Sequence, residues 1–142
     1  MDGYGKRVLV VEDDEDVRTI ICLILSEAGY NVYEAADGLE ALEALKKRRY
    51  DAVLTDYHMP RMDGLELLDL VQAMWPHTPV IVASSDRLLS ERTEQSLLAP
   101  AYAVLAKPFE SAHLLSAVRS ATNGMPRTLH RPAFCPTYQA AA

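Results

Sequence analysis

Residues 8–14 read Val-Leu-Val-Val-Glu-Asp-Asp, a short apolar run followed directly by three acids. Three similar apolar runs lie further along the chain, at Ala52–Leu54, Val80–Ala83 and Ala103–Ala106. These runs are too short for helices, rich in valine and continuous, which is typical of parallel strands buried on both faces. A fifth stretch, Asn31–Ala35, alternates polar and apolar residues and predicts a less buried edge strand.

Helical patterns separate these five stretches. Apolar residues spaced three and four apart predict a helix from Val17 to Ala28 and another over Leu114–Ala121. Asp37–Glu40 and Asp63–Glu66 each have the spacing of a capping box at the start of a helix. A helix is also expected over Leu88–Leu98, although its apolar positions form only a weak stripe.

Strand and helix therefore alternate five times, which predicts an α/β fold. The expected architecture is a doubly wound, five-stranded parallel sheet with right-handed crossovers and helices on both faces. If the strands take the flavodoxin-like order 2-1-3-4-5, a ligand binds at the carboxyl ends of the first and third strands. This fold class thus locates a site before any motif is considered.

Length and charge set further limits on the function. The 142 residues carry a net charge of −6, so the surface should repel nucleic acid, and no apolar run is long enough to span a bilayer. We expect a soluble, cytoplasmic domain over residues 1–122. Residues 123–142 hold three of the eight prolines and no acid, which predicts a flexible tail. Cys22 lies in a helical pattern and is expected to be a buried free thiol.

Acidic side chains gather at the predicted site. Glu12 and Asp13 follow the first strand, and Asp56 ends the third. Three converging carboxylates repel one another unless a cation joins them, and hard oxygen ligands in an open site favour Mg²⁺. Taken singly, the same residues have simpler explanations: acids also stabilise a helix N-terminus, which we prefer for Asp14–Asp16, and Asp56 alone could be a turn residue.

The fourth and fifth strands end on groups of a different kind, Ser84 and Lys107. A hydroxyl and an ammonium facing a carboxylate cluster suit the equatorial oxygens of a phosphoryl group. Aspartate is a nucleophile that forms an acyl phosphate. Alone, Ser84 would be a turn hydroxyl and Lys107 an exposed charge, but four strand ends that all supply fitting groups predict phosphoryl transfer to Asp56.

Four motifs carry a family resemblance. They are VLVVEDD at 8–14, VLTDYHMPRMDG at 53–64, PVIVASS at 79–85 and AKPF at 106–109. Together they resemble the receiver domain of bacterial response regulators, over about residues 6–122.

The resemblance implies roles for individual residues. Asp56 is expected to be the phosphoacceptor, Ser84 the switch hydroxyl, and Lys107 the lysine that contacts the phosphoryl group. The Lys107–Pro108 peptide is expected to be cis. The expected contacts of Mg²⁺ are Asp13 directly, Glu12 through a bound water, Asp56 and the backbone carbonyl of His58.

The implied function is that of a phosphorylatable switch in a two-component system rather than an enzyme with a separate substrate. A histidine kinase or phosphotransfer protein would supply the phosphoryl group to Asp56. The surface around the fourth and fifth strands and the Leu88–Leu98 helix would then change and regulate a partner protein or an output domain. The resemblance also allows a weak homodimer; it implies no direct binding to nucleic acid or membrane.

One position departs from the family pattern. Val104 stands three residues before Lys107, where an aromatic residue usually follows the switch hydroxyl inward. Tyr102, two residues earlier, is expected to share a face with Val104 and could sense the shift indirectly. The alternative is that a partner reads the loop after the fourth strand directly. Pro100-Ala101, in place of a common Gly-Ala pair, is a milder departure.

Three other functions would use part of the same pattern. A haloacid-dehalogenase-type phosphatase would need an aspartate where His58 stands, and a cap insertion. A flavodoxin-like electron carrier would need a phosphate loop where Glu12–Asp14 would repel a flavin phosphate. A degenerate, purely protein-binding receiver would normally have lost Asp56, Asp13 or Lys107, and all three are present.

Overall fold

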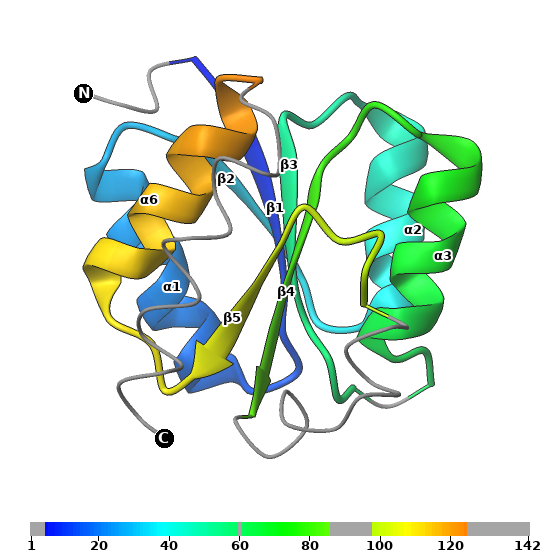
Figure 1. The fold of residues 1–142 in the computed structure, drawn as a ribbon, viewed down its shortest axis with the longest axis horizontal. Coiled ribbons are helices and arrows are strands. Elements are labelled where there is room, and N and C mark those ends of the chain that lie inside the picture. Colours follow the sequence, from blue (N-terminus) through cyan, green and yellow to red (C-terminus); the bar gives the residue numbers. More distant parts are fainter. Residues whose placement is uncertain (1–4, 60, 86–97, 125–142) are drawn as a thin grey trace.

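The computed structural model describes residues 5–59, 61–85 and 98–124 (Figure 1). Its helices and strands are, in chain order, β1 (Arg7–Val11), α1 (Glu15–Glu27), β2 (Asn31–Ala35), α2 (Gly38–Lys47), β3 (Ala52–Asp56), α3 (Gly64–Met74), β4 (Val80–Ser85), β5 (Ala103–Lys107) and α6 (Ser111–Thr122). All strand pairs are parallel and the order is β2-β1-β3-β4-β5. The predicted fold class and strand order are confirmed.

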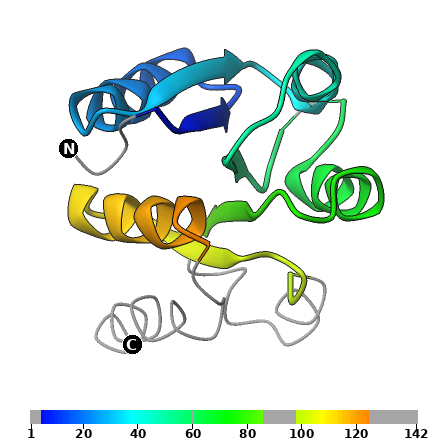
Figure 2. The same ribbon diagram turned by 90° about the horizontal axis from the view of Figure 1, so that it is seen from above.

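The sheet lies between two layers of helices, with α1 and α6 on one face and α2 and α3 on the other (Figures 1 and 2). Side chains of β1 alternate between these layers: Leu9 and Val11 pack with α2 and α3, and Val8 and Val10 pack with α1 and α6. All four are buried. This two-sided burial is why β1 is apolar at successive positions, whereas the edge strand β2 is partly exposed, as predicted.

Three helices begin at an aspartate that follows a strand. Asp14, Asp37 and Asp63 cap α1, α2 and α3, and each side chain accepts a hydrogen bond from a backbone N–H of the first turn. Such caps satisfy donors that would otherwise lack an intrahelical partner. The N-cap bonds of the two predicted capping boxes are thus confirmed, with Asp37 and Asp63 each accepting from the N–H of the glutamate three residues on. The N-terminal role expected for the acids at 14–16 is confirmed as well.

The predicted shared face of Tyr102 and Val104 is wrong. Tyr102 packs in the cluster of α1 and α6, whereas Val104 packs against the cluster of α2 and α3. Strand alternation does not apply to this pair because β5 begins only at Ala103, after Tyr102. A relay in which Tyr102 senses the site from the face of Val104 therefore has no basis in the fold.

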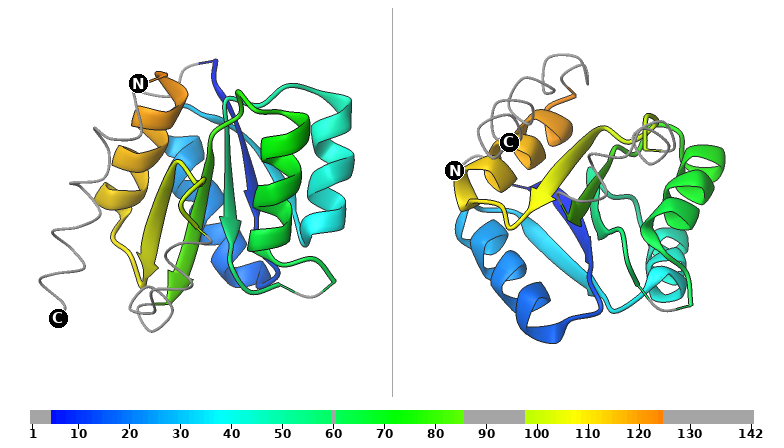
Figure 3. Two further views of the ribbon diagram at one scale, coloured as in Figure 1. Left: turned by 45° about the vertical axis from the view of Figure 1, so that its right-hand side comes forward. Right: turned by 60° about the horizontal axis from the view of Figure 1, so that its bottom comes forward.

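Two expectations fall on parts of the chain that lie outside the described residues. These are the helix over Leu88–Leu98, of which only Leu98 is described, and the tail beyond residue 124. Within the described ranges, no helix combines the length and the apolar character needed to cross a membrane. The strands all point to one edge of the sheet, which comes forward in the right-hand view of Figure 3.

Candidate functional site

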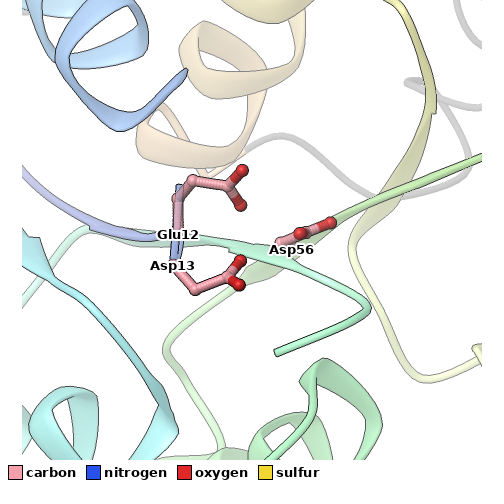
Figure 4. Close-up of side chains that lie close together, drawn as sticks. All are labelled: Glu12, Asp13 and Asp56. Atoms are coloured by element: carbon pink, nitrogen blue, oxygen red, sulfur yellow. The ribbon is translucent and has the colours of Figure 1, made fainter. Parts of the chain in front are cut away.

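Glu12, Asp13 and Asp56 point toward one another at the carboxyl edge of the sheet (Figure 4). One oxygen atom from each lies within 4.8 Å of the others. The register of the strands produces this meeting: Val11 of β1 pairs with Thr55 of β3, so the residues that follow them come side by side. The convergence predicted from the sequence is confirmed.

The first two acids differ in how they are held. Glu12 is 3% exposed, and its backbone N–H donates to the Ala35 carbonyl over 3.1 Å. The Glu12 carbonyl accepts from Nη1 of Arg18 at 2.7 Å. Asp13 is exposed. The cluster thus has a buried, firmly held side and a side open to solvent.

Lys107 brings a positive charge to this cluster from the end of β5. Its Nζ lies 3.0 Å from Oδ1 of Asp56 and 3.4 Å from Oε1 of Glu12. Burial acts to lower the pKa of Lys107, but the hydrogen bond and the charge of Asp56, together with Glu12, outweigh it and raise that pKa. The ammonium therefore stays charged and partly neutralises the carboxylates.

Glu12 is the acid whose ionisation is most disturbed by this arrangement. Its pKa rises from 4.5 to about 7, chiefly because burial disfavours the charged form. The hydrogen bond and negative charge of Asp56 raise it further, while Lys107 acts in the opposite direction. Burial is thus the main reason that Glu12 resists ionisation, and repulsion by Asp56 adds to it.

Ser84 adds a hydroxyl on the neighbouring strand. Ala83 of β4 pairs with Asp56, and Ser84 is the next residue toward the carboxyl edge. The serine is 1% exposed, and among the described residues its Oγ has no hydrogen-bond partner. Buried hydroxyls normally have one, so this unpaired group is suited to a ligand oxygen placed beside Asp56.

The loop after Asp56 returns to the strand that it leaves. The Gly64 N–H donates to the Tyr57 carbonyl over 2.8 Å, and a Cβ on Gly64 would lie 2.9 Å from Cα of Tyr57 and collide with the Asp56 carbonyl oxygen. His58 is exposed in this loop, its ring edge-on to Tyr57 at 4.9 Å. The Lys107–Pro108 peptide is cis, as expected.

The structural roles of Gly64, the first residue of α3, and of Arg61 in the loop before it do not follow from the sequence. Sequence spacing indicates Gly64 only as part of a motif and a capping box, not as the residue that lets α3 approach Asp56. Arg61 pairs with Asp37 at the start of α2, a contact that no spacing rule predicts across 24 residues.

Comparison with known proteins decides the family. The family model for the response regulator receiver domain matches residues 8–119. The chain belongs to this family. Its strand order and the carboxylate cluster at the strand ends agree with that assignment, and the dehalogenase-type and flavodoxin-like alternatives are set aside.

Relatives of this receiver include longer proteins and isolated domains. It is 40% identical over 114 residues to the response regulator MprA of Mycobacterium sp. (strain KMS), covering 80% of this chain but 49% of that protein. The chain thus spans about half the length of the curated relatives that it matches.

Two solved structures show the same fold at domain length. The receiver domain of NtrX from Brucella abortus has 32% identity and a TM-score of 0.76, covering 82% of this chain and 98% of that one. The signal receiver domain of a signal transduction histidine kinase from Syntrophus aciditrophicus has 28% identity and a TM-score of 0.77, covering 84% and 92%.

The raised pKa of Glu12 predicts how the stability of the metal-free receiver varies with pH. A carboxyl whose folded pKa exceeds its unfolded pKa stabilises the fold fully below the unfolded value and loses that contribution as pH rises through the folded value. As the pH rises from 4.5 to about 7, ionisation of Glu12 should therefore lower the free energy of unfolding by up to about 3 kcal/mol.

Glu12→Gln should remove this dependence, because glutamine stays neutral. In excess chelator, urea unfolding should show the variant to be more stable than wild type at pH 8 and nearly equal to it at pH 5. Glu15→Gln, which changes an exposed first-turn carboxylate of α1, is the matched control. An equal effect of Glu12→Gln at both pH values would contradict the assignment.

Proposed function

We propose that this receiver accepts a phosphoryl group on Asp56. The observation that supports this most is the setting of Asp56, whose Oδ1 lies 3.0 Å from Lys107 Nζ. On the neighbouring strand lies the buried hydroxyl of Ser84, which is unpaired within the described part of the chain. A nucleophilic carboxylate, a fixed cation and a free donor at one strand edge are the groups that phosphoryl transfer uses.

In the proposed transfer, a carboxylate oxygen of Asp56 attacks phosphorus and forms an acyl phosphate. The bond from phosphorus to the donor breaks at the same centre, and the donor's leaving atom keeps the electron pair. The donor is a phosphohistidine on a histidine kinase or phosphotransfer protein, or a small acyl phosphate. The chain catalyses only its own phosphorylation and dephosphorylation, and is in this sense not an enzyme.

The donor set fits Mg²⁺. Three carboxylates within 4.8 Å, one of them exposed, offer hard oxygen ligands and an open side for waters. Asp13 and Asp56 would hold the ion directly, with Glu12 through a water and the His58 carbonyl as a further contact. When bound, the ion supplies positive charge that offsets the phosphoryl oxygens.

Lys107 and Ser84 would act on the phosphoryl group once it is on Asp56. The Lys107 ammonium is already oriented by Asp56 and Glu12, so it needs little rearrangement to meet an anionic oxygen. The Ser84 hydroxyl has no hydrogen-bond partner within residues 5–59, 61–85 and 98–124. Its movement toward the phosphoryl group would shift β4 and the segment after it, and so change the surface beside β5 that a partner contacts.

We propose residues 1–122 as the receiver domain, acting in the cytoplasm, where a kinase finds ATP. Its output would be a downstream protein or a further domain. The curated relatives are about twice as long as this chain, which is consistent with a receiver domain joined to an output module. The similar receiver domain of a histidine kinase is consistent with a place inside a kinase. The phosphorylated domain would act by protein contact, including weak dimerisation, rather than by binding nucleic acid or membrane.

Intact-mass analysis tests the proposed function. After incubation with acetyl phosphate, wild type should gain the mass of one phosphoryl group when Mg²⁺ is present and none in excess chelator. Excess Mg²⁺ added back to the chelated sample should restore the gain in mass, which shows that the chelator has not damaged the protein. Labelling that ignores the chelator would contradict the role of the carboxylate cluster in metal binding.

A further inference from the structure

The loop between β3 and α3, described at residues 57–59 and 61–63, is anchored to the start of α2. Helix α2 contributes no group to the phosphoacceptor site. Nη2 of Arg61 donates to Oδ2 of Asp37. The Asp37 side chain is 3% exposed, whereas that of Arg61 is 61% exposed. A buried carboxylate thus holds a cation that reaches in from the surface of the loop.

Asp37 is a rigid anchor because a second role fixes its orientation. Its Oδ1 accepts the Glu40 N–H at 2.9 Å and caps α2. Glu40 in turn accepts from the Ala36 N–H at 3.2 Å, so the turn before the helix is also held. The carboxylate is therefore positioned by α2 whether or not the loop is ordered.

A second contact joins the same two segments. Met62 packs on Gly38 so closely that a Cβ on that glycine would lie 2.7 Å from the Met62 Cβ. Arg61 has a φ of 68°, a left-handed conformation that non-glycine residues rarely adopt. Two consecutive loop residues thus meet two consecutive residues at the start of α2.

The anchored loop also determines the geometry around Asp56. It leaves β3 at Asp56 and returns at Gly64, whose N–H donates to the Tyr57 carbonyl at 2.8 Å. The residues between include His58, whose carbonyl is a proposed metal contact. A change in the position of Arg61 can therefore reach His58 and Asp56 through Gly64 and its hydrogen bond to Tyr57, the residue between them.

We propose that the Arg61–Asp37 ion pair is a positioning contact that sets the affinity of the site for Mg²⁺. The proposal rests on the proposed function, since it concerns the same metal site. Without the pair, the loop must be ordered when the ion binds, and this ordering weakens binding. The pair thus makes α2 a determinant of metal affinity, although none of its residues touches the ion.

The test measures Mg²⁺ binding by isothermal titration calorimetry on the unphosphorylated protein. Arg61→Ala removes the cation; Asp37→Asn removes the charge but keeps a good N-cap residue. Each should raise the Kd for Mg²⁺ about tenfold or more, as when a partner that orients a metal ligand is lost. The double variant should bind no more weakly than either single variant, because both changes break one contact. At saturating Mg²⁺, labelling by acetyl phosphate should reach the wild-type plateau.

Lys46→Ala is the matched control. It removes one positive charge, as Arg61→Ala does, but from an exposed ion pair with Glu43 at 3.5 Å on α2. Its Kd should equal that of wild type, and Arg61→Lys should restore part of the lost affinity. Circular dichroism checks the folding of each variant, and Asp37→Asn carries the test if Arg61→Ala does not fold.

Equal Kd values for Arg61→Ala and Lys46→Ala, or additive losses in the double variant, would overturn the inference while leaving the proposed function intact. Failure of the proposed function has a different signature. Wild type itself would then neither bind Mg²⁺ nor take up a phosphoryl group, and the inference would fall with it.

Discussion

Asp56→Asn is expected to take up no phosphoryl group from acetyl phosphate under conditions in which every wild-type molecule is phosphorylated. The amide is a poor nucleophile and cannot form an acyl phosphate, while its shape matches the carboxylate. Removing one negative charge beside Glu12 should also relieve repulsion, so the variant should stay folded and still fail to react. Intact mass after equal incubation times measures the effect.

Asp69→Asn is the matched control, because it makes the same chemical change at an exposed position on α3. It should be labelled as fully as wild type. Hydroxylamine separates the chemistry further: it cleaves an acyl phosphate but leaves a serine or threonine phosphoester intact. A hydroxylamine-resistant label, or a labelled Asn variant, would place the phosphoryl group on another residue.

The second large effect concerns Lys107→Met. Methionine keeps the length of the side chain but removes the ammonium that lies 3.0 Å from Oδ1 of Asp56. Loss of one fixed donor to developing negative charge typically slows a reaction about 10²-fold. The rate of phosphoryl gain at saturating Mg²⁺ should fall by about this factor, because this ammonium is in direct contact with Asp56. A time course of intact mass gives the rate.

Lys47→Met, at an exposed position on α2, controls for the change in net charge. The metal-free protein offers a second measurement. Burial raises the pKa of Glu12 and Lys107 lowers it. The pKa of Glu12 should therefore rise further in the Lys107→Met variant. If Lys107→Met gains the phosphoryl group at a rate within threefold of wild type, Lys107 offsets the carboxylates of the metal-free protein but does not take part in the transfer.

Much of this receiver could be predicted from sequence because its signals are local. The buried strands are continuous apolar runs, α1, α2 and α3 start at capping aspartates, and parallel order then brings Glu12, Asp13 and Asp56 together. Each of these inferences needs only neighbouring residues and one rule of topology.

The rest depends on contacts that sequence spacing does not encode. Tyr102 was placed by strand alternation, but the strand begins one residue later, and the ring packs on the other face. The pairing of Arg61 with Asp37 depends on the path of a loop with a left-handed residue. The burial of the Ser84 hydroxyl, with no partner among the residues that the structure describes, likewise follows from packing around β4 rather than from sequence position.

The wide spacing of the site along the chain has a consequence for biosynthesis. The Glu12–Lys107 ion pair joins residues 95 positions apart, and Lys107 is on the last strand of the sheet. During translation, Glu12, Asp13 and Asp56 all leave the ribosome long before their cation does. Until β5 docks, the nascent chain holds converging acids with no Lys107 to offset them, which opposes early closure of this edge. Competence to accept a phosphoryl group should thus appear late, and it would indicate that the fifth strand has been made and has docked.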